Sequence, residues 1–225
     1  MISYLSEDRK FTNPFAKITR AKIVLAELRR ESEKLATSCA PGIDKRQSKS
    51  GVEFAFHNAD RVGTSYLSAI AGDVIHNLRS ALDQTASEMA RIKGKSDASV
   101  YFPFASKEAD LDQIIKSKNF HFAGDSAVAH LKSLKPFRGG NILLRCIHDF
   151  DIEDKHRSLI SISQQVATPM LNIGSDSEPF GTTFQTLLSF NCRIDSVLSG
   201  NPIIETLENM IDLVESIVKS FSELK

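Results

Sequence analysis

The stretch Gly72-Asp-Val-Ile-His-Asn-Leu-Arg-Ser-Ala-Leu-Asp-Gln84 lies in the most strongly patterned helix that the sequence predicts. Thr64 or Ser65 can cap this helix, and Gly94 can terminate it. Its apolar residues recur at helical spacing and form one stripe, made of Leu67, Ile70, Val74, Leu78, Leu82 and Met89. The opposite side, a band of roughly 60° on a helical wheel, carries Gly72, His76, Arg79 and Asp83. We therefore expect the fold to be built around a helix with one apolar face and one unusual polar face.

The composition of this polar face differs from that of an ordinary solvated face. Solvated helix faces are usually rich in Lys and Glu, whereas this one holds His, Arg, Asp, Asn, Ser and Gln. Gly72 costs the helix about 1 kcal/mol relative to Ala, so we expect another segment to approach the backbone closely there. The polar face is therefore predicted to be covered at least in part, with its Arg and Asp side chains paired and hydrogen-bonded.

A second polar cluster, His148-Asp-Phe-Asp-Ile-Glu-Asp-Lys-His-Arg157, lies at the end of a helix predicted over residues 142–153. Asp154 continues the apolar stripe of that helix by spacing, so its side chain is expected to point inward. An Arg79–Asp154 ion pair, or alternatively an Asp83–Arg157 or an Asp83–His156 pair, would satisfy both polar segments.

Outside these segments, the sequence predicts further helices and a β-like region. Helices are expected over residues 13–38 and 107–118, from a cap at Ser126 to residue 135, from a cap at Asn141 onward, and after Asn201-Pro202. A short extended segment is expected at residues 100–104, around Pro103. Residues 52–56 alternate as in a short strand, residues 44–51 are typical of a loop, and the segments 159–166 and 180–190 have strand-like composition around a turn at 174–176. The predicted fold class is α+β. One domain over residues 1–225 is mainly a helical bundle, with a small antiparallel sheet inserted before the C-terminal helix.

Composition and charge narrow the class of protein. The chain has 225 residues, of which 41% are hydrophobic and 25% charged, and this excludes disordered and collagen-like chains. Lys and Arg number 28 and Asp and Glu number 28, a balance that does not favour charge-driven binding to nucleic acid or membrane. Three irregularly spaced cysteines, Cys39, Cys146 and Cys192, form no disulfide framework or zinc motif and predict a cytoplasmic protein. The first ten residues lack the apolar core of a signal peptide, and no run reaches the roughly 18 apolar residues of a membrane span, so no membrane association is expected.

Two motifs resemble known families. His76-Asn-Leu-Arg-Ser-Ala-Leu-Asp-Gln84, followed by Asp154-Lys-His-Arg157, resembles a bacterial family without an established activity, whose members read Asn-Leu-Arg-Ser-Ala-Leu-Asp-His and Asp-Lys-His-Arg. The helix also resembles, more weakly, HEPN domains, which are helical bundles that include ribonucleases. Those domains carry an Arg followed, after four to six residues, by a His. Arg79 matches that Arg, but position 84, where the His would stand after four residues, holds Gln84. Either His156 or His76 then supplies the imidazole, or this copy is inactive, or the similarity is superficial.

Three kinds of function fit these features, and the sequence leaves open whether the protein is an enzyme. In the first, the Arg, Asp and His cluster is a structural network or an interaction module, and a homodimer could form through the apolar face of the final helix. In the second, the protein is a metal-independent ribonuclease or a nucleic-acid-binding protein that takes RNA or another phosphate-containing ligand. The predicted catalytic residues are His76, Arg79, Asp83, Asp154, His156 and Arg157.

Each of these residue types has a role in such a reaction. Arg79 would hold phosphate through its planar fork of donors, His156 or His76 would move the proton, and Asp83 or Asp154 would orient the imidazole. The third kind of function is a metal site, for which Asp73 and His76 have i, i+3 spacing and His148, Asp151 and His156 could add ligands. No motif predicts an organic cofactor.

Overall fold

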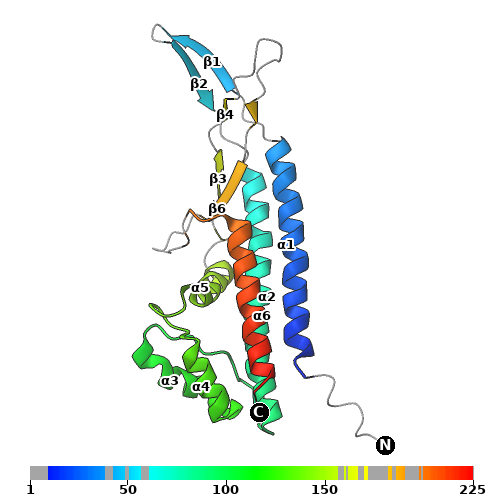
Figure 1. Cartoon of the computed structure of the whole chain (residues 1–225), viewed down its shortest axis with the longest axis vertical. Coiled ribbons are helices and arrows are strands. Elements are labelled where there is room, and N and C mark those ends of the chain that lie inside the picture. The colour runs from blue at the N-terminus through cyan, green and yellow to red at the C-terminus, as the bar shows by residue number, and fades with distance from the viewer. Residues whose placement is uncertain are drawn as a thin grey trace, which may run out of the picture.

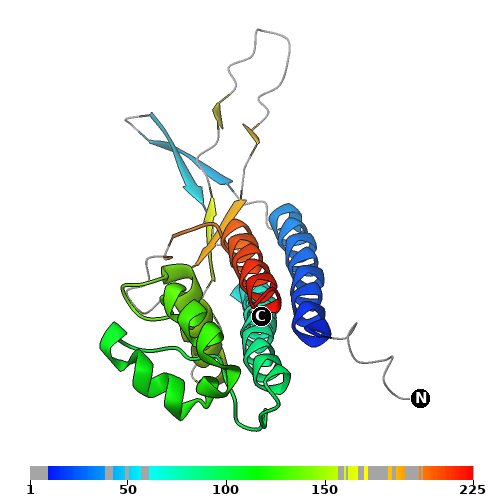
Figure 2. The ribbon, with the colours of Figure 1, turned by 60° about the horizontal axis from the view of Figure 1, so that its bottom comes forward.

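The computed structural model describes residues 10–38, 43–48, 51–56, 61–156, 160, 162–166, 170–171, 182–183, 186–190, 198 and 200–224, and side chains within 10–35, 65–155, 160, 198 and 200–224. The main elements of the fold are three long helices: α1 (Thr12–Ser38), α2 (Arg61–Ile92) and α6 (Ile203–Ser222). They run side by side, and α2 contacts both of the others (Figures 1 and 2). Each long helix was predicted from its apolar spacing, although α2 begins earlier than the caps Thr64 and Ser65 indicated.

Shorter helices cover one side of α2 and α6. They are the 3-10 helix η1 (Glu108–Asp110), α3 (Leu111–Ser117), the 3-10 helix η2 (Phe120–Ala123), α4 (Asp125–Ser133) and α5 (Ile142–His156). The predicted cap of α5 is confirmed, because Asn141 Oδ1 accepts the backbone N–H of Leu144 at 3.0 Å. The predicted cap of α4 is wrong, because that helix begins at Asp125 and places Ser126 inside its first turn.

The predicted α+β class is wrong, because the described chain is mainly helical. Its strands form no common sheet. They pair as three separate antiparallel ladders, β1 (Ile43–Ser48) with β2 (Gly51–Phe56), β3 (Ile162–Val166) with β6 (Thr186–Phe190), and β4 (Met170–Leu171) with β5 (Thr182–Thr183). An α+β fold needs a sheet that packs as a layer on helices, and two-stranded ladders do not provide one.

The polar stretch 44–51 was predicted to be a loop, and that prediction is also wrong. Residues 43–48 form β1, with Lys45 opposite Phe54 and Gln47 opposite Val52 in the ladder with β2. Pairing with a strand of alternating apolar residues overrides the low strand propensity of Asp, Lys and Arg. The predicted turn at 174–176 lies outside the described residues.

The described core comes from the helices and from one extended segment, residues 100–105, which was predicted to be extended over residues 100–104. Phe102 is 1% exposed and packs edge-on against Phe120 of η2 and Phe221 of α6, with ring centroids 6.1 and 6.3 Å away. Val100, Phe104 and Ala105 are buried too. Apart from Tyr101, which is exposed, the side chains of the 100–105 segment therefore pack between α2, α5 and α6, although the segment has no regular secondary structure of its own.

Within the described residues, no helix combines the length and the apolar character that crossing a membrane requires.

Candidate functional site

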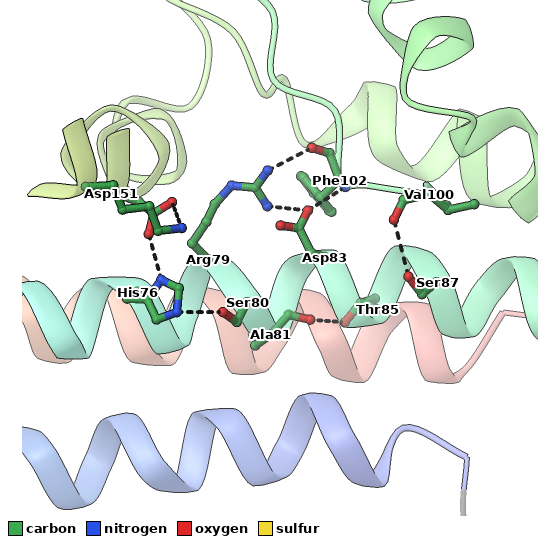
Figure 3. Close-up of polar contacts among 11 residues, drawn as sticks. His76, Arg79, Ser80, Ala81, Asp83, Thr85, Ser87, Val100, Phe102 and Asp151 are labelled. Carbon is green, nitrogen blue, oxygen red and sulfur yellow. Dashed lines mark hydrogen bonds and ion pairs between the residues drawn. The ribbon is translucent and has the colours of Figure 1, made fainter. Parts of the chain in front are cut away.

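The polar face of α2 binds the backbone of the 100–105 segment. Asp83 Oδ1 accepts the backbone N–H of Phe102 at 2.9 Å, and Arg79 Nη2 donates to the carbonyl oxygen of the same residue at 3.5 Å (Figure 3). One turn further along, Ser87 Oγ donates to the carbonyl oxygen of Val100 at 3.2 Å. An extended segment has no helical hydrogen bonds of its own, so these side chains satisfy backbone groups that would otherwise be buried without partners.

Arg79 and Asp83 also form an ion pair with each other. Arg79 Nη1 lies 2.5 Å from Asp83 Oδ1, and Arg79 is only 8% exposed. The guanidinium carbon lies 4.8 Å from the centroid of the Phe104 ring, which covers it. The prediction that the Arg and Asp of this face are covered, paired and hydrogen-bonded is confirmed for these two residues.

Helix α5 holds the same segment from the other side through Arg145. This side chain is 9% exposed and donates to the carbonyl oxygen of Ala105 at 3.0 Å. Its Nε and Nη2 donate to the two carboxylate oxygens of Asp149 at 3.2 and 2.7 Å, an arrangement that compensates the buried charge. Sequence analysis missed Arg145, although its i, i+4 spacing to Asp149 on a predicted helix is a usable signal.

His148 packs flat on Phe104. The two rings are 4.5 Å apart with an interplanar angle of 3°, and His148 Nδ1 is buried with no hydrogen-bond partner among the described residues. Burial, followed by the positive charges of Arg79 and Arg145, lowers the pKa of His148 to about 4. The imidazole is therefore neutral at physiological pH and acts as a packing residue. A neutral imidazole does not act as a cationic ligand for phosphate.

His76 lies further toward the N-terminus of α2 and has a different setting. Its Nδ1 is 3.0 Å from Asp151 Oδ1, and its Nε2 is 3.5 Å from Ser80 Oγ (Figure 3). Asp151 is 7% exposed and also accepts from Lys155 Nζ at 2.8 Å, while the His76 side chain is 45% exposed. An exposed imidazole oriented by a buried carboxylate has the geometry that a general acid or base requires.

Asp154 lies directly against Gly72. A Cβ atom on Gly72 would stand 2.6–2.7 Å from the Asp154 carboxyl group, which confirms the prediction that a neighbouring segment approaches this glycine closely. The predicted Arg79–Asp154 ion pair is wrong, because Arg79 pairs with Asp83 four residues away on its own helix. Burial raises the pKa of Asp154, and the nearby Asp73 and Asp151 carboxylates act in the same direction.

The remaining predicted residues are His156 and Arg157. His156 is the last residue of α5, but its side chain lies outside the described residues, and so does all of Arg157. The predicted pairs Asp83–Arg157 and Asp83–His156 therefore stay predictions. In the described part of the chain, no group of three or more His, Cys, Asp and Glu side chains is arranged to hold a metal ion.

The predicted site thus separates into three contacts along α2. Arg79 and Asp83 bind the 100–105 segment, and His76 contacts Asp151 on α5. The carboxyl group of Asp154, also on α5, lies against Gly72. No protein-family model, curated protein or solved structure matches the chain. The resemblances to the bacterial family and to HEPN domains therefore stay expectations that rest on the motifs alone.

Proposed function

We propose that the polar face of α2 is a structural lock and that the chain works as a non-catalytic helical scaffold. The lock consists of Arg79, Asp83 and Ser87 on α2 and Arg145 on α5, which together hold the 100–105 segment. The observation that carries the proposal is the use of Asp83: one carboxylate oxygen accepts the Phe102 N–H and also compensates Arg79.

The position of Arg79 argues against a phosphate-binding role. An arginine that recognises phosphate presents its planar fork of donors to the ligand. The guanidinium of Arg79 is almost fully buried, and it is occupied by Asp83, by the carbonyl oxygen of Phe102 and by the ring of Phe104. A phosphate could reach it only after the 100–105 segment had moved away.

The expected contribution of the Arg79–Asp83 ion pair to the free energy of unfolding favours a role in stabilising the fold. Removing one partner of a buried ion pair typically costs about 3–5 kcal/mol, because the other charge stays buried without compensation. Asp83 is 28% exposed, so we expect a value near the lower end of that range for this pair. Ion pairs on exposed surfaces usually contribute less than about 1 kcal/mol.

This difference provides a test with a matched control on the same helix. Arg79→Met keeps an unbranched, flexible side chain, which is shorter than that of arginine, and removes the charge and the hydrogen-bond donors. Arg91→Met makes the same change at a residue whose side chain is 48% exposed and pairs with Glu88 and Asp97. In urea unfolding, we expect Arg79→Met to lose about 3 kcal/mol and Arg91→Met less than about 1 kcal/mol.

RNA cleavage distinguishes the lock from the ribonuclease alternative. We expect the wild-type chain to leave single-stranded RNA intact in the presence of a chelator. Chelator-resistant cleavage that is lost in both Arg79→Met and His76→Ala, while the stability of these variants is unchanged, would refute the lock and support a ribonuclease.

A further inference from the structure

A serine, a histidine and a carboxylate lie in a row where α5 meets the polar face of α2 (Figure 3). Ser80 Oγ lies 3.5 Å from His76 Nε2, and His76 Nδ1 lies 3.0 Å from Asp151 Oδ1. The second oxygen of Asp151 accepts from Lys155 Nζ at 2.8 Å, which leaves Oδ1 for the imidazole. Ser80 and His76 do not belong to the structural lock, although they lie on the same face of α2.

The hydrogen-bonding roles in this row follow from its buried end. An ionised carboxylate only accepts hydrogen bonds, so Asp151 fixes the imidazole hydrogen of His76 on Nδ1. The neutral imidazole then has its lone pair on Nε2, and the hydroxyl group of Ser80 donates to it. A base that contacts a hydroxyl group and is oriented by a third group activates that hydroxyl as a nucleophile. Such contacts are often long before a substrate binds.

The reacting groups are open to small molecules, but α2 does little to stabilise a negative charge on them. The His76 side chain is 45% exposed and Ser80 is half-buried. Ser80 lies in the middle of α2, where backbone N–H groups donate to carbonyl oxygens of the helix. Helix α2 therefore offers no backbone donor to the oxyanion of acyl transfer, and the lack of one such donor slows the reaction by about 10²–10³-fold. Only a donor with a good leaving group then reacts, and the resulting ester is hydrolysed slowly for the same reason.

We propose that Ser80 is a site of covalent acylation, modified once per chain by activated acyl donors such as aryl esters and thioesters. Ser80 Oγ attacks the acyl carbonyl carbon and forms the new C–O bond, while its proton moves to His76 Nε2. The bond to the leaving group breaks with its electron pair, and the leaving group takes that proton from His76. The modification is stoichiometric, so the scaffold gains a modified side chain without turnover. This proposal does not depend on the structural lock.

The reaction of the full chain with p-nitrophenyl acetate tests the proposal. The wild type should rapidly release one equivalent of p-nitrophenol and gain one acetyl group, which peptide mapping should place on Ser80. Ser87 is an internal control on the same helix, because its hydroxyl group donates to the carbonyl oxygen of Val100, and it should stay unmodified. Ser80→Ala should remove the label and leave only the slow reaction of surface lysines.

Two variants test the roles of His76 and Asp151. His76→Gln keeps a polar side chain without the base, so acetylation of Ser80 should slow by about a hundredfold or more. In Asp151→Asn, Lys155 retains the amide oxygen, and the amide N–H donates to His76 Nδ1. The imidazole hydrogen should then move to Nε2, which ¹⁵N NMR of the imidazole detects, and acetylation should slow as well.

Circular dichroism should show the helical signal of the wild type for all three variants. Four results would overturn the proposal: an unlabelled Ser80, equal labelling of Ser80 in His76→Gln, an unchanged imidazole tautomer in Asp151→Asn, or rapid release that continues beyond one equivalent.

Discussion

The stability of the protein should fall in mild acid because of His148. This half-buried imidazole stacks on Phe104. Burial, together with the positive charges of Arg79 and Arg145, lowers its pKa to about 4, compared with 6.5 for an unperturbed histidine. Between these two values the unfolded chain binds a proton that the folded chain does not bind. Stability is therefore complete above the unfolded pKa and is lost as the pH falls toward the folded pKa.

The size of the effect follows from the difference in pKa. Each unit corresponds to about 1.36 kcal/mol, so the full difference is worth about 3 kcal/mol. Lowering the pH from about 7.5 to about 5 should reduce the free energy of unfolding by about 2 kcal/mol. Urea unfolding followed by circular dichroism at both values measures it.

His148→Phe isolates this contribution from those of the other titratable groups. Phenylalanine keeps a ring that can stack on Phe104 and removes the proton-binding site. The buried Nδ1 has no described partner that the substitution would strand. The difference in unfolding free energy between wild type and variant should change by about 2 kcal/mol between the two pH values. Parallel pH profiles for wild type and His148→Phe would refute the reasoning.

Two further predictions concern the contact between Gly72 and Asp154. Gly72→Ala should destabilise the wild-type chain, because the new Cβ would meet the Asp154 carboxyl group at 2.6–2.7 Å, but it should stabilise an Asp154→Ala background by about 1 kcal/mol, the helix propensity of Ala over Gly. The same sign in both backgrounds on thermal melting would contradict the contact. Asp154→Asn should raise the urea midpoint at neutral pH. Burial raises the pKa of this carboxyl group in the folded chain above its value in the unfolded chain. The free energy of unfolding therefore falls as the pH rises between the two pKa values, and at neutral pH the ionised carboxylate destabilises the fold. An unchanged midpoint would show that the carboxylate is well solvated.

Sequence analysis predicted the features that depend on local spacing. The long helices follow from apolar periodicity, and the approach of another segment to Gly72 follows from the cost of glycine within a helix. The covering of Arg79 and Asp83 follows from the absence of Lys and Glu on their face. Each of these inferences uses residues of a single helix, where geometry is fixed by the sequence.

Two of the errors, the partner of Arg79 and the fold class, concern contacts between segments distant in sequence. Arg79 was predicted to pair with Asp154, but it pairs with Asp83, four residues away on the same helix. Side chains at this spacing are neighbours on the helix surface, so the pair forms without bringing a distant segment into place. The partner of this face is the 100–105 segment, whose Phe102 is bound through its backbone, and backbone hydrogen bonds leave no pattern of side chains to recognise. The fold class was wrong because strand-like composition predicts extended backbone but does not predict how many strands pair in one sheet.

Amide hydrogen exchange at Phe102 tests the structural lock most directly. This N–H donates to Asp83 Oδ1 in a segment without regular secondary structure, so its protection reports the lock itself. In wild-type protein we expect a protected amide. In Asp83→Ala its exchange should accelerate by at least about tenfold, the equivalent of about 1.4 kcal/mol, while the amide of Leu78 in the core of α2 accelerates less. A Phe102 amide that exchanges freely in the wild type, or equally slowly in both proteins, would contradict the lock.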